Sequence, residues 1–326
     1  MYWLIWLLYL LGALAIVATL LPMWHTTRWW VRVCDFPRFQ IALLALAILI
    51  VLPLLRWPQG VAEWAFLVAL AAAFLWQMTW IWRYLPGAPR EVKSGNAPLG
   101  APERIALLTT NVLVPSRGAD RLLDIIAAAD PDLILAVETD EWWCGRLAEG
   151  LQSRYPHSIR HPLSNGYGLA LFSRLELVDP EIRFVVDEAI PSIRTGVRLR
   201  SGAIIDVYGV HPRPPAVMQD SIERDLELVR VGSEIKQRRR PAIVLGDLND
   251  VAWSPTTVEF MRAGDLCDPR RGRGFYNTYP AKWPGFRYPL DYVFSTAQFE
   301  VCGMRVLPRF SSDHLPLIAS LCLKPE

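Results

Sequence analysis

Polar side chains stand at the ends of apolar runs from about residue 105 to the end of this 326-residue sequence. In AIVLGDLND, residues 242–250, the apolar run stops at Gly246, and Asp247 and Asn249 follow. Taken alone, such a cluster is ordinary turn chemistry, because Gly, Asp and Asn are the residues that turns prefer. The same carboxylate, amide and imidazole groups recur beside other apolar runs: Asn111, Glu138 and His211 after them, and Asp291, Asp313 and His314 before them. This repetition indicates a functional site, because a rigid sheet can aim several strand-end side chains at one ligand.

The residue types favour phosphoester chemistry assisted by a divalent cation. Hard cations such as Mg²⁺ and Mn²⁺ prefer carboxylate and amide oxygens. The strand ends supply four such side chains: Glu138, Asp247, Asn249 and Asp313. Paired cysteines and an H-E-x-x-H sequence, which are typical of zinc sites, do not occur. The histidines can move protons and stabilise developing negative charge, so the sequence predicts phosphoester hydrolysis with Mg²⁺ or Mn²⁺ as the cofactor.

The elements that position these groups can be predicted from apolar periodicity. Short apolar runs predict strands at residues 105–110, 133–137, 168–172, 193–199, 204–210, 242–245, 292–294, 301–306 and 317–323. Helical spacing predicts helices at residues 119–129, 141–154 and 218–239. Some strands are separated by helices and others follow one another directly, which is typical of a layered α/β domain with partly antiparallel sheets.

The ordered motifs TTN, VE, VH, GDLN, LDYVF and SDHLP resemble those of the endonuclease/exonuclease/phosphatase superfamily. This group includes DNase I-like nucleases, sphingomyelinases and inositol polyphosphate phosphatases. The resemblance covers residues 103–323 and leaves the apolar first part of the chain outside. It implies a four-layer α/β sandwich, in which two face-to-face mixed sheets are flanked by helices and the site lies at one edge.

The resemblance also implies roles for individual residues. Glu138 would be the principal metal ligand, helped by Asn111 and Asp313. Asp247 would orient or deprotonate the attacking water, and Asn249 would donate to a phosphate oxygen.

The two histidines would act on the phosphate itself. His314 would contact it as an imidazolium, with Asp291 holding its tautomer and charge. His211 would contact the phosphate or the leaving oxygen.

Two arginines are further candidates for substrate binding. Arg213, in HPRPP, is either a bidentate phosphate clamp or an exposed loop charge. Arg287, in NTYPAKWPGFRYPLD, lies either on a substrate-facing rim or in a packed loop.

The first part of the chain has the composition of a membrane segment. Hydrophobic residues make up 52% of the sequence, and ten of the 14 tryptophans precede residue 83. Apolar stretches at residues 2–21, 41–55 and 61–82 predict three spanning helices, since roughly 20 apolar residues cross a bilayer. The middle stretch is short, so a re-entrant helix with only two spans is the alternative. The chain therefore divides into a transmembrane region (1–84), a Pro- and Gly-rich linker (85–102) and a catalytic domain (103–326).

Basic residues predict the orientation. With three spans, the arginines between residues 28 and 38 lie on the side of the catalytic domain, whereas the opposite side carries only Arg56. This arrangement predicts a multi-pass protein of a bacterial inner membrane with a cytoplasmic catalytic domain. The five cysteines are odd in number and widely spaced, which favours reduced thiols, although Cys302 and Cys322 fall on strands that could be neighbours.

The charge balance bears on the substrate. From residue 100 onward the chain holds 27 Lys and Arg against 29 Asp and Glu, without the basic excess of a sequence-independent DNA binder. The balance favours a phosphodiesterase or phosphatase acting on a lipid headgroup or another phosphoester near the bilayer. A DNA or RNA nuclease of the same fold is the alternative. A catalytically inactive membrane adaptor is the third reading, against which the complete set of polar residues argues.

Overall fold

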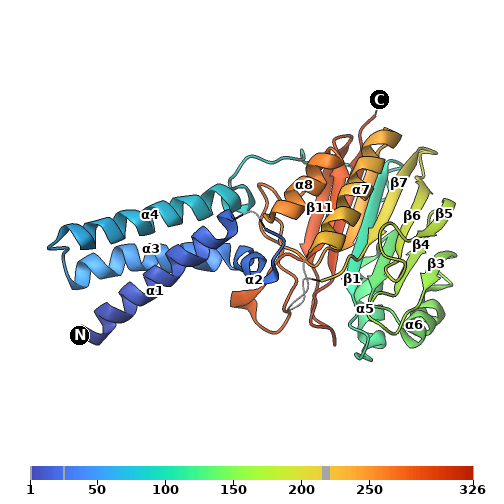
Figure 1. Ribbon diagram of the computed structural model, residues 1–326. Coiled ribbons are helices and arrows are strands. Elements are labelled where there is room, and N and C mark those ends of the chain that lie inside the picture. Colours follow the sequence, from blue (N-terminus) through green and yellow to red (C-terminus); the bar gives the residue numbers. More distant parts are fainter. Residues whose placement is uncertain (1, 25, 215–220, 326) are drawn as a thin grey trace.

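The computed structural model describes residues 2–24, 26–214 and 221–325, and consists of a bundle of long helices beside an α/β sandwich (Figure 1). The bundle contains α1 (Tyr2–Leu20), α3 (Arg38–Leu55) and α4 (Val61–Ile81). Each of them is long and apolar enough to cross a membrane. The short middle stretch forms a continuous helix of 18 residues, α3. Pro53 does not interrupt this helix, because it lies in the last turn. The three helices indicate association with a membrane.

Small residues let the three helices pack closely. Gly12 of α1 faces Phe66 of α4, and a Cβ at this glycine would lie 2.5 Å from the ring. Ala45 and Leu70 are buried between the helices, whereas Leu54 is 80% exposed on the outside. An apolar outer surface with its backbone bonds satisfied inside each helix is suited to a lipid environment.

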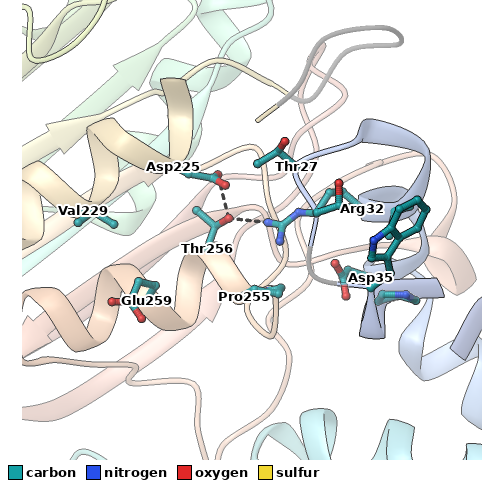
Figure 2. Close-up of a pocket in the computed structure, with 12 residues that line it drawn as sticks. Thr27, Arg32, Asp35, Asp225, Val229, Pro255, Thr256 and Glu259 are labelled. Carbon is teal, nitrogen blue, oxygen red and sulfur yellow. Dashed lines mark hydrogen bonds between the residues drawn. The ribbon is translucent and has the colours of Figure 1, made fainter. Parts of the chain in front are cut away.

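A short connector joins α1 to α3 and lies between the bundle and the sandwich (Figure 1). It contains three short helices: η1 (Leu21–Met23), α2 (Trp29–Arg32) and η2 (Val33–Asp35). The guanidinium of Arg32 lies 3.3 Å from Asp250 Oδ2 and donates to Thr256 Oγ1 at 2.5 Å, a contact drawn in Figure 2. The indole N–H of Trp253 donates to the backbone oxygen of Asp35 at 2.7 Å. These contacts fix the connector to the sandwich.

The segment predicted as a linker, residues 85–102, lies along the sandwich. The backbone N–H of Val301 donates to Lys93 O at 2.8 Å, and that of Gly95 donates to Val301 O at 3.0 Å. Val92 is buried in the core between the two sheets. After α4, a short helix η3 (Trp82–Tyr84) leads into this segment. The segment therefore acts as a strap that joins the bundle to the sandwich.

Two six-stranded mixed sheets form the sandwich. Their strand orders are β11-β12-β1-β2-β4-β3 and β5-β6-β7-β8-β10-β9. In the first sheet β1 runs parallel to β2 and antiparallel to β12, and in the second β8 runs parallel to β7 and antiparallel to β10. The strands are β1 (Arg104–Asn111), β2 (Leu133–Val137), β3 (His157–His161), β4 (Leu169–Ser173), β5 (Leu177–Arg183), β6 (Ser192–Arg198), β7 (Ile204–Val210), β8 (Ala242–Asp247), β9 (Leu266–Cys267), β10 (Asp291–Thr296), β11 (Phe299–Val306) and β12 (Leu317–Leu323).

Alternating side chains divide the apolar residues between two layers of core. In β2, Leu133, Leu135 and Val137 belong to the core between the sheets, while Ile134 and Ala136 pack on the helix side. Helices α5 (Ala119–Ala129) and α6 (Glu141–Leu151) cover the first sheet, and α7 (Ile222–Arg238) and α8 (Pro255–Ala263) cover the second. The predicted four-layer α/β sandwich is confirmed.

The sequence did not predict β3, β5, β9 or α8. The three strands all lie at sheet edges, where β3 and β5 contact the core on one face at most and carry few apolar residues. Helix α8 has only nine residues, and its start depends on a local cap, in which Ser254 Oγ accepts the backbone N–H of Thr257. The helix predicted at 218–239 begins at Ile222, and residues 218–220 lie outside the described part of the chain.

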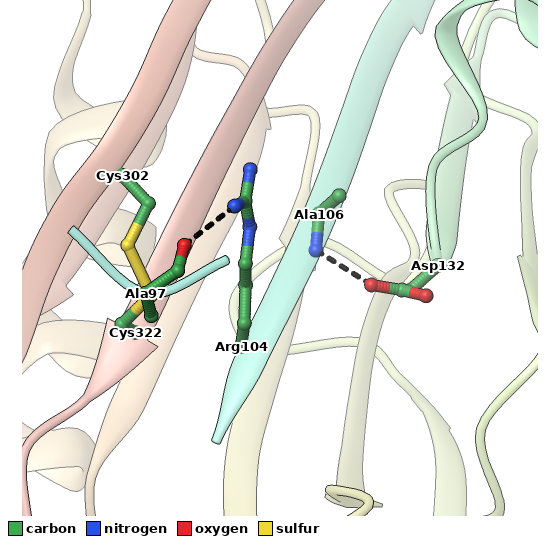
Figure 3. Close-up of a disulfide and its surroundings, with 6 residues drawn as sticks. All are labelled: Ala97, Arg104, Ala106, Asp132, Cys302 and Cys322. Atoms are coloured by element: carbon green, nitrogen blue, oxygen red, sulfur yellow. Dashed lines mark hydrogen bonds between the residues drawn. A yellow bond between two sulfur atoms is a disulfide. The ribbon is translucent and has the colours of Figure 1, made fainter. Parts of the chain in front are cut away.

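A disulfide joins Cys302 of β11 to Cys322 of β12, with 6.5 Å between the two Cα atoms (Figure 3). The prediction of reduced thiols is therefore wrong for this pair. A β-bulge between Val301 and Gly303 places Cys302 beside its partner on the neighbouring antiparallel strand, a proximity that spacing along the sequence cannot reveal. The remaining three cysteines are free.

Candidate active site

The predicted site residues meet at one end of the sandwich, and both sheets contribute to it. β1, β2 and β12 adjoin in the first sheet, and β7, β8 and β10 adjoin in the second. Since β12 and β10 run antiparallel to their neighbours, their beginnings lie beside the ends of the other strands. This end of the sandwich carries Asn111, Glu138, Asp313 and His314 from the first sheet, and His211, Asp247, Asn249 and Asp291 from the second.

The local backbone is specialised around these residues. Gly246 has φ +143°, and a Cβ there would lie 1.9 Å from Val210 O, so only glycine lets β8 approach β7 directly before Asp247. Glu138 and Asn249 both adopt left-handed conformations, with φ of 59° and 53°. Such conformations are unfavourable for glutamate and cluster at functional sites. Glu138 and Asn249 thus have strained backbone conformations at the positions from which their side chains enter the site.

Asn111 links the carboxylates of the two sheets. Its Nδ2 donates to Glu138 Oε1 at 2.7 Å and to Asp247 Oδ2 at 3.0 Å. Its Oδ1 accepts the backbone N–H of Leu113 at 3.0 Å. A half-turn of the amide would instead direct Oδ1 at the carboxylate pair, where a cation would be bound. In the observed orientation the amide bridges the two carboxylates.

His314 lies between two buried aspartates. Its Nδ1 is 2.8 Å from Asp291 Oδ2, and its Nε2 is 3.6 Å from Asp247 Oδ2. Burial lowers the pKa of His314, but the carboxylates of Asp291 and Asp247 outweigh this effect and raise it to about 10. His314 is therefore an imidazolium at neutral pH, as the resemblance implies, and can place positive charge beside a phosphate.

His211 and Asn249 are held by the turn after β8. Nδ1 of His211 lies 3.3 Å from the backbone oxygen of Asp247, and its Nε2 lies 3.9 Å from Glu138 Oε1. The backbone N–H of Asn249 donates to Asp247 Oδ1 at 2.8 Å, and its Nδ2 donates to Pro212 O at 3.0 Å. Both side chains are thus oriented beside Asp247.

These groups open onto a cavity of about 440 Å³. Its lining includes Glu138, Asn249, Asp313 and His314. A second cavity of about 280 Å³, drawn in Figure 2, lies between the connector and helices α7 and α8. None of the strand-end residues lines that second cavity, so the chemistry belongs to the first.

The residues of the first cavity fit a divalent cation. Glu138, Asp247 and Asp313 supply hard oxygen atoms, and among the described residues no lysine or arginine forms an ion pair with any of them. Asp247, Asp291 and His314 also lie within 4.8 Å of one another. In that group the His314 ring already forms an ion pair with Asp291, so these two side chains are not free to bind a cation. The cation therefore fits better at Glu138, beside Asn111 and Asp313.

The two arginines predicted to bind substrate are engaged with protein atoms. The Arg213 guanidinium bonds the carboxylate of Asp187 and lies 6.0 Å from the centre of the Tyr167 ring. Arg287 donates to the backbone oxygen of Ala281 at 2.5 Å. Neither lines the 440 Å³ cavity. A role in phosphate binding stays a prediction for both.

Sequence reasoning missed an aromatic residue and an apolar wall. The Tyr279 ring centre lies 4.8 Å from that of His314, and burial, with the nearby carboxylates of Asp313 and Asp247, raises the pKa of its hydroxyl. Tyr279 belongs to a loop, where no periodicity marks a residue as functional. The apolar wall comes from the connector and consists of Trp29, Val33 and Phe36.

Fold and site together define a phosphoester hydrolase scaffold. The family model for the endonuclease/exonuclease/phosphatase family matches residues 108–314, and the chain therefore belongs to this family. Its members are phosphoester hydrolases that depend on a divalent metal ion.

Solved structures agree on the fold. An endonuclease/exonuclease/phosphatase from Beutenbergia cavernae is 20% identical with a TM-score of 0.56, over 68% of this chain and 72% of its own. D. rerio TDP2 complexed with a single-strand DNA product is 18% identical with a TM-score of 0.56, over 67% and 98%. Beta toxin from Staphylococcus aureus is 16% identical with a TM-score of 0.52, over 66% and 99%. Comparison with curated proteins finds no match.

The geometry predicts different effects for the two aspartates of GDLND. Asp247→Asn keeps the shape of the side chain but removes the group that would prepare the attacking water, so we expect a rate loss of about 10²- to 10⁴-fold. Asp250→Asn is the matched control, because Asp250 is equally buried but pairs with Arg32 and Arg224. It should lower the melting temperature of the full-length protein and keep the rate within about threefold. Retention of more than about a third of the wild-type rate by Asp247→Asn would contradict the water-activating role.

A second prediction concerns the charge of His314. In Asp291→Asn the nearest carboxylate is lost, so we expect the pKa of His314, about 10 in the wild type, to fall. NMR titration of protein labelled at histidine, without added metal, measures it. The signals of His157 and His161 in β3 are internal controls that should be the same in both proteins. An unchanged His314 titration would show that Asp291 does not set its charge.

Proposed function

We propose that this protein is a membrane-anchored hydrolase of phosphoesters that uses Mg²⁺ or Mn²⁺. The observation that carries the proposal is that groups from both sheets meet at one cavity. Glu138, Asn249, Asp313 and His314 line it, while His211 lies 3.9 Å from Glu138 and Asp247 lies 3.6 Å from His314. Glu138, with Asn111 and Asp313, would hold the cation, which when bound polarises the phosphoryl group and lowers the pKa of water.

The chain's own residues supply the remaining steps. Asp247, buried and oriented by Asn111, accepts a proton from the attacking water. Asn249 and the imidazolium of His314 donate to phosphate oxygens and stabilise the negative charge that develops in the transition state. His211, whose Nε2 lies 3.9 Å from Glu138 Oε1, would contact the phosphate or the leaving oxygen.

A phosphoester near the bilayer is favoured over nucleic acid as substrate. The part of the chain from residue 100 onward has no basic excess, and many of its arginines are committed to ion pairs within the sandwich, such as Arg270 with Asp268 and Arg238 with Asp206. A nuclease would need free basic side chains for the nucleic acid backbone. The complete set of polar residues argues against an inactive adaptor.

The three long helices support a multi-pass location in a bacterial inner membrane. The disulfide bears on the orientation, because disulfides persist where thiols are oxidised. Two of the arginines used to predict orientation also have roles in the folded protein, since Arg32 pairs with Asp250 and Arg38 with Asp35. We therefore infer that the catalytic domain lies outside the cytoplasm, which reverses the orientation predicted from the basic residues.

The metal requirement can be tested directly. Chelation with EDTA should abolish hydrolysis of bis(4-nitrophenyl) phosphate by the full-length protein, and Mg²⁺ or Mn²⁺ should restore it. Among the described residues, no lysine or arginine forms an ion pair with Glu138 or Asp313, so a bound cation is needed to balance their charge. Glu138→Gln should raise the metal concentration needed for half-maximal activity, because the cation loses a charged ligand. Full turnover in excess chelator, after metal removal is verified, would overturn this mechanism.

The orientation can be tested with thiol-specific labels. In protein taken from cells under denaturing, non-reducing conditions, we expect three of the five cysteines to react before reduction and all five after it. A carboxyl-terminal alkaline phosphatase fusion should be active. The double variant Cys302→Ser/Cys322→Ser is the control and should give the same label count before and after reduction. Five reactive thiols at the outset, with an inactive fusion, would support the cytoplasmic orientation instead.

A further inference from the structure

One wall of the catalytic cavity is built by the membrane-anchoring part of the chain. Trp29, Val33 and Phe36 line it opposite the polar residues of the sandwich. Val33 is 54% exposed although it is apolar. An apolar side chain left open beside catalytic carboxylates is unexpected for a site that binds only a small polar phosphoester.

This wall is a fixed part of the site. Arg32, between Trp29 and Val33 in sequence, is 9% exposed and bonds both Asp250 and Thr256 of the sandwich. The ring centre of Phe36 lies 5.6 Å from that of Tyr288 in an edge-to-face contact. The connector therefore holds its apolar side chains at the mouth of the site.

The apolar wall belongs to the segment that joins two of the three candidate membrane helices. The connector runs from the end of α1 to the start of α3, and carries the exposed aromatic residues Trp24 and Trp30. Tryptophan is enriched at the boundary between lipid and water. This level is the depth of lipid headgroups.

The loop between Tyr279 and Leu290, two residues that line the cavity, is also apolar on its surface. Trp283 and Phe286 are 63% and 61% exposed, and Gln40 in the first turns of α3 donates to the backbone oxygen of Gly285 at 3.4 Å. This loop is thus held beside the membrane end of α3. The exposed apolar side chains of this loop and of the connector can contact the acyl region, while the carboxylates and His314 belong to the sandwich.

We propose that the substrate is a membrane lipid whose phosphoester headgroup enters the cavity while its apolar chain stays against Trp29, Val33 and Phe36. This rests on the proposed hydrolase function and specifies its substrate. A lipid substrate explains why the cavity has an apolar wall. It also explains why this wall is part of the connector between two of the long apolar helices. A soluble phosphoester accounts for none of these features.

The test uses full-length protein reconstituted in vesicles of a total bacterial polar-lipid extract with Mg²⁺. Release of water-soluble phosphorus from the vesicles reports lipid hydrolysis, and bis(4-nitrophenyl) phosphate reports the chemistry alone. In Val33→Asn we expect the rate on lipid, divided by the rate on the soluble ester, to fall about tenfold, because the apolar contact is lost and the carboxylates remain. Leu99→Asn is the matched control, since Leu99 is 86% exposed and lies in the strap, and both of its rates should equal the wild type.

Each outcome decides between the two proposals. A wild-type protein that cleaves the soluble ester or plasmid DNA, but releases no phosphorus from the vesicles, would exclude the lipid substrate and leave the hydrolase function in place. Equal loss on both substrates in Val33→Asn would also exclude the apolar wall as a chain-binding surface. Failure to hydrolyse any of the three substrates would overturn the hydrolase function, and the lipid substrate with it.

Discussion

The carboxylate of Asp247 connects the two sheets of the sandwich through polar contacts with Asn111 and His314. It lies at the end of β8 in the second sheet, yet Asn111 of the first sheet donates to it at 3.0 Å and His314 of the first sheet lies 3.6 Å away. Because it is buried, its charge has to be balanced by donors aimed from several directions. The relative position of the sheets therefore determines whether the site exists, and the apolar core between them fixes that position.

GDLND places two buried aspartates three residues apart and gives them different partners. Asp247 contacts Asn111 and His314, while Asp250 pairs with Arg32 of the connector and Arg224 of α7. One short turn thus positions both the carboxylate proposed to prepare the attacking water and the connector between α1 and α3. This local coupling explains how a segment outside the family's matched residues can form part of the cavity. It also makes the membrane part more than a tether, since its removal would open one wall of the site.

Local sequence was sufficient for much of this architecture. Apolar alternation identified the central strands, such as β2 and β7, within a residue or two, since a buried strand must carry apolar side chains on one or both faces. Helices α5 and α6 were recognisable from their amphipathic spacing. The polar residues at the strand ends could be found because a strand end is a fixed place from which to aim a side chain, and the order of those residues along the chain carried the resemblance to the family.

Contacts between distant segments were decided only by the tertiary structure. The edge strands β3 and β5 carry little periodicity because only part of each is covered by neighbouring elements. The Cys302 disulfide depends on strand neighbourhood and a bulge, and the position of Tyr279 beside His314 depends on the path of a loop. The apolar wall required the connector to fold back on the sandwich. The sequence determined which groups could do chemistry, because residue type and periodicity are local properties; which groups face one cavity was decided by packing between segments hundreds of residues apart.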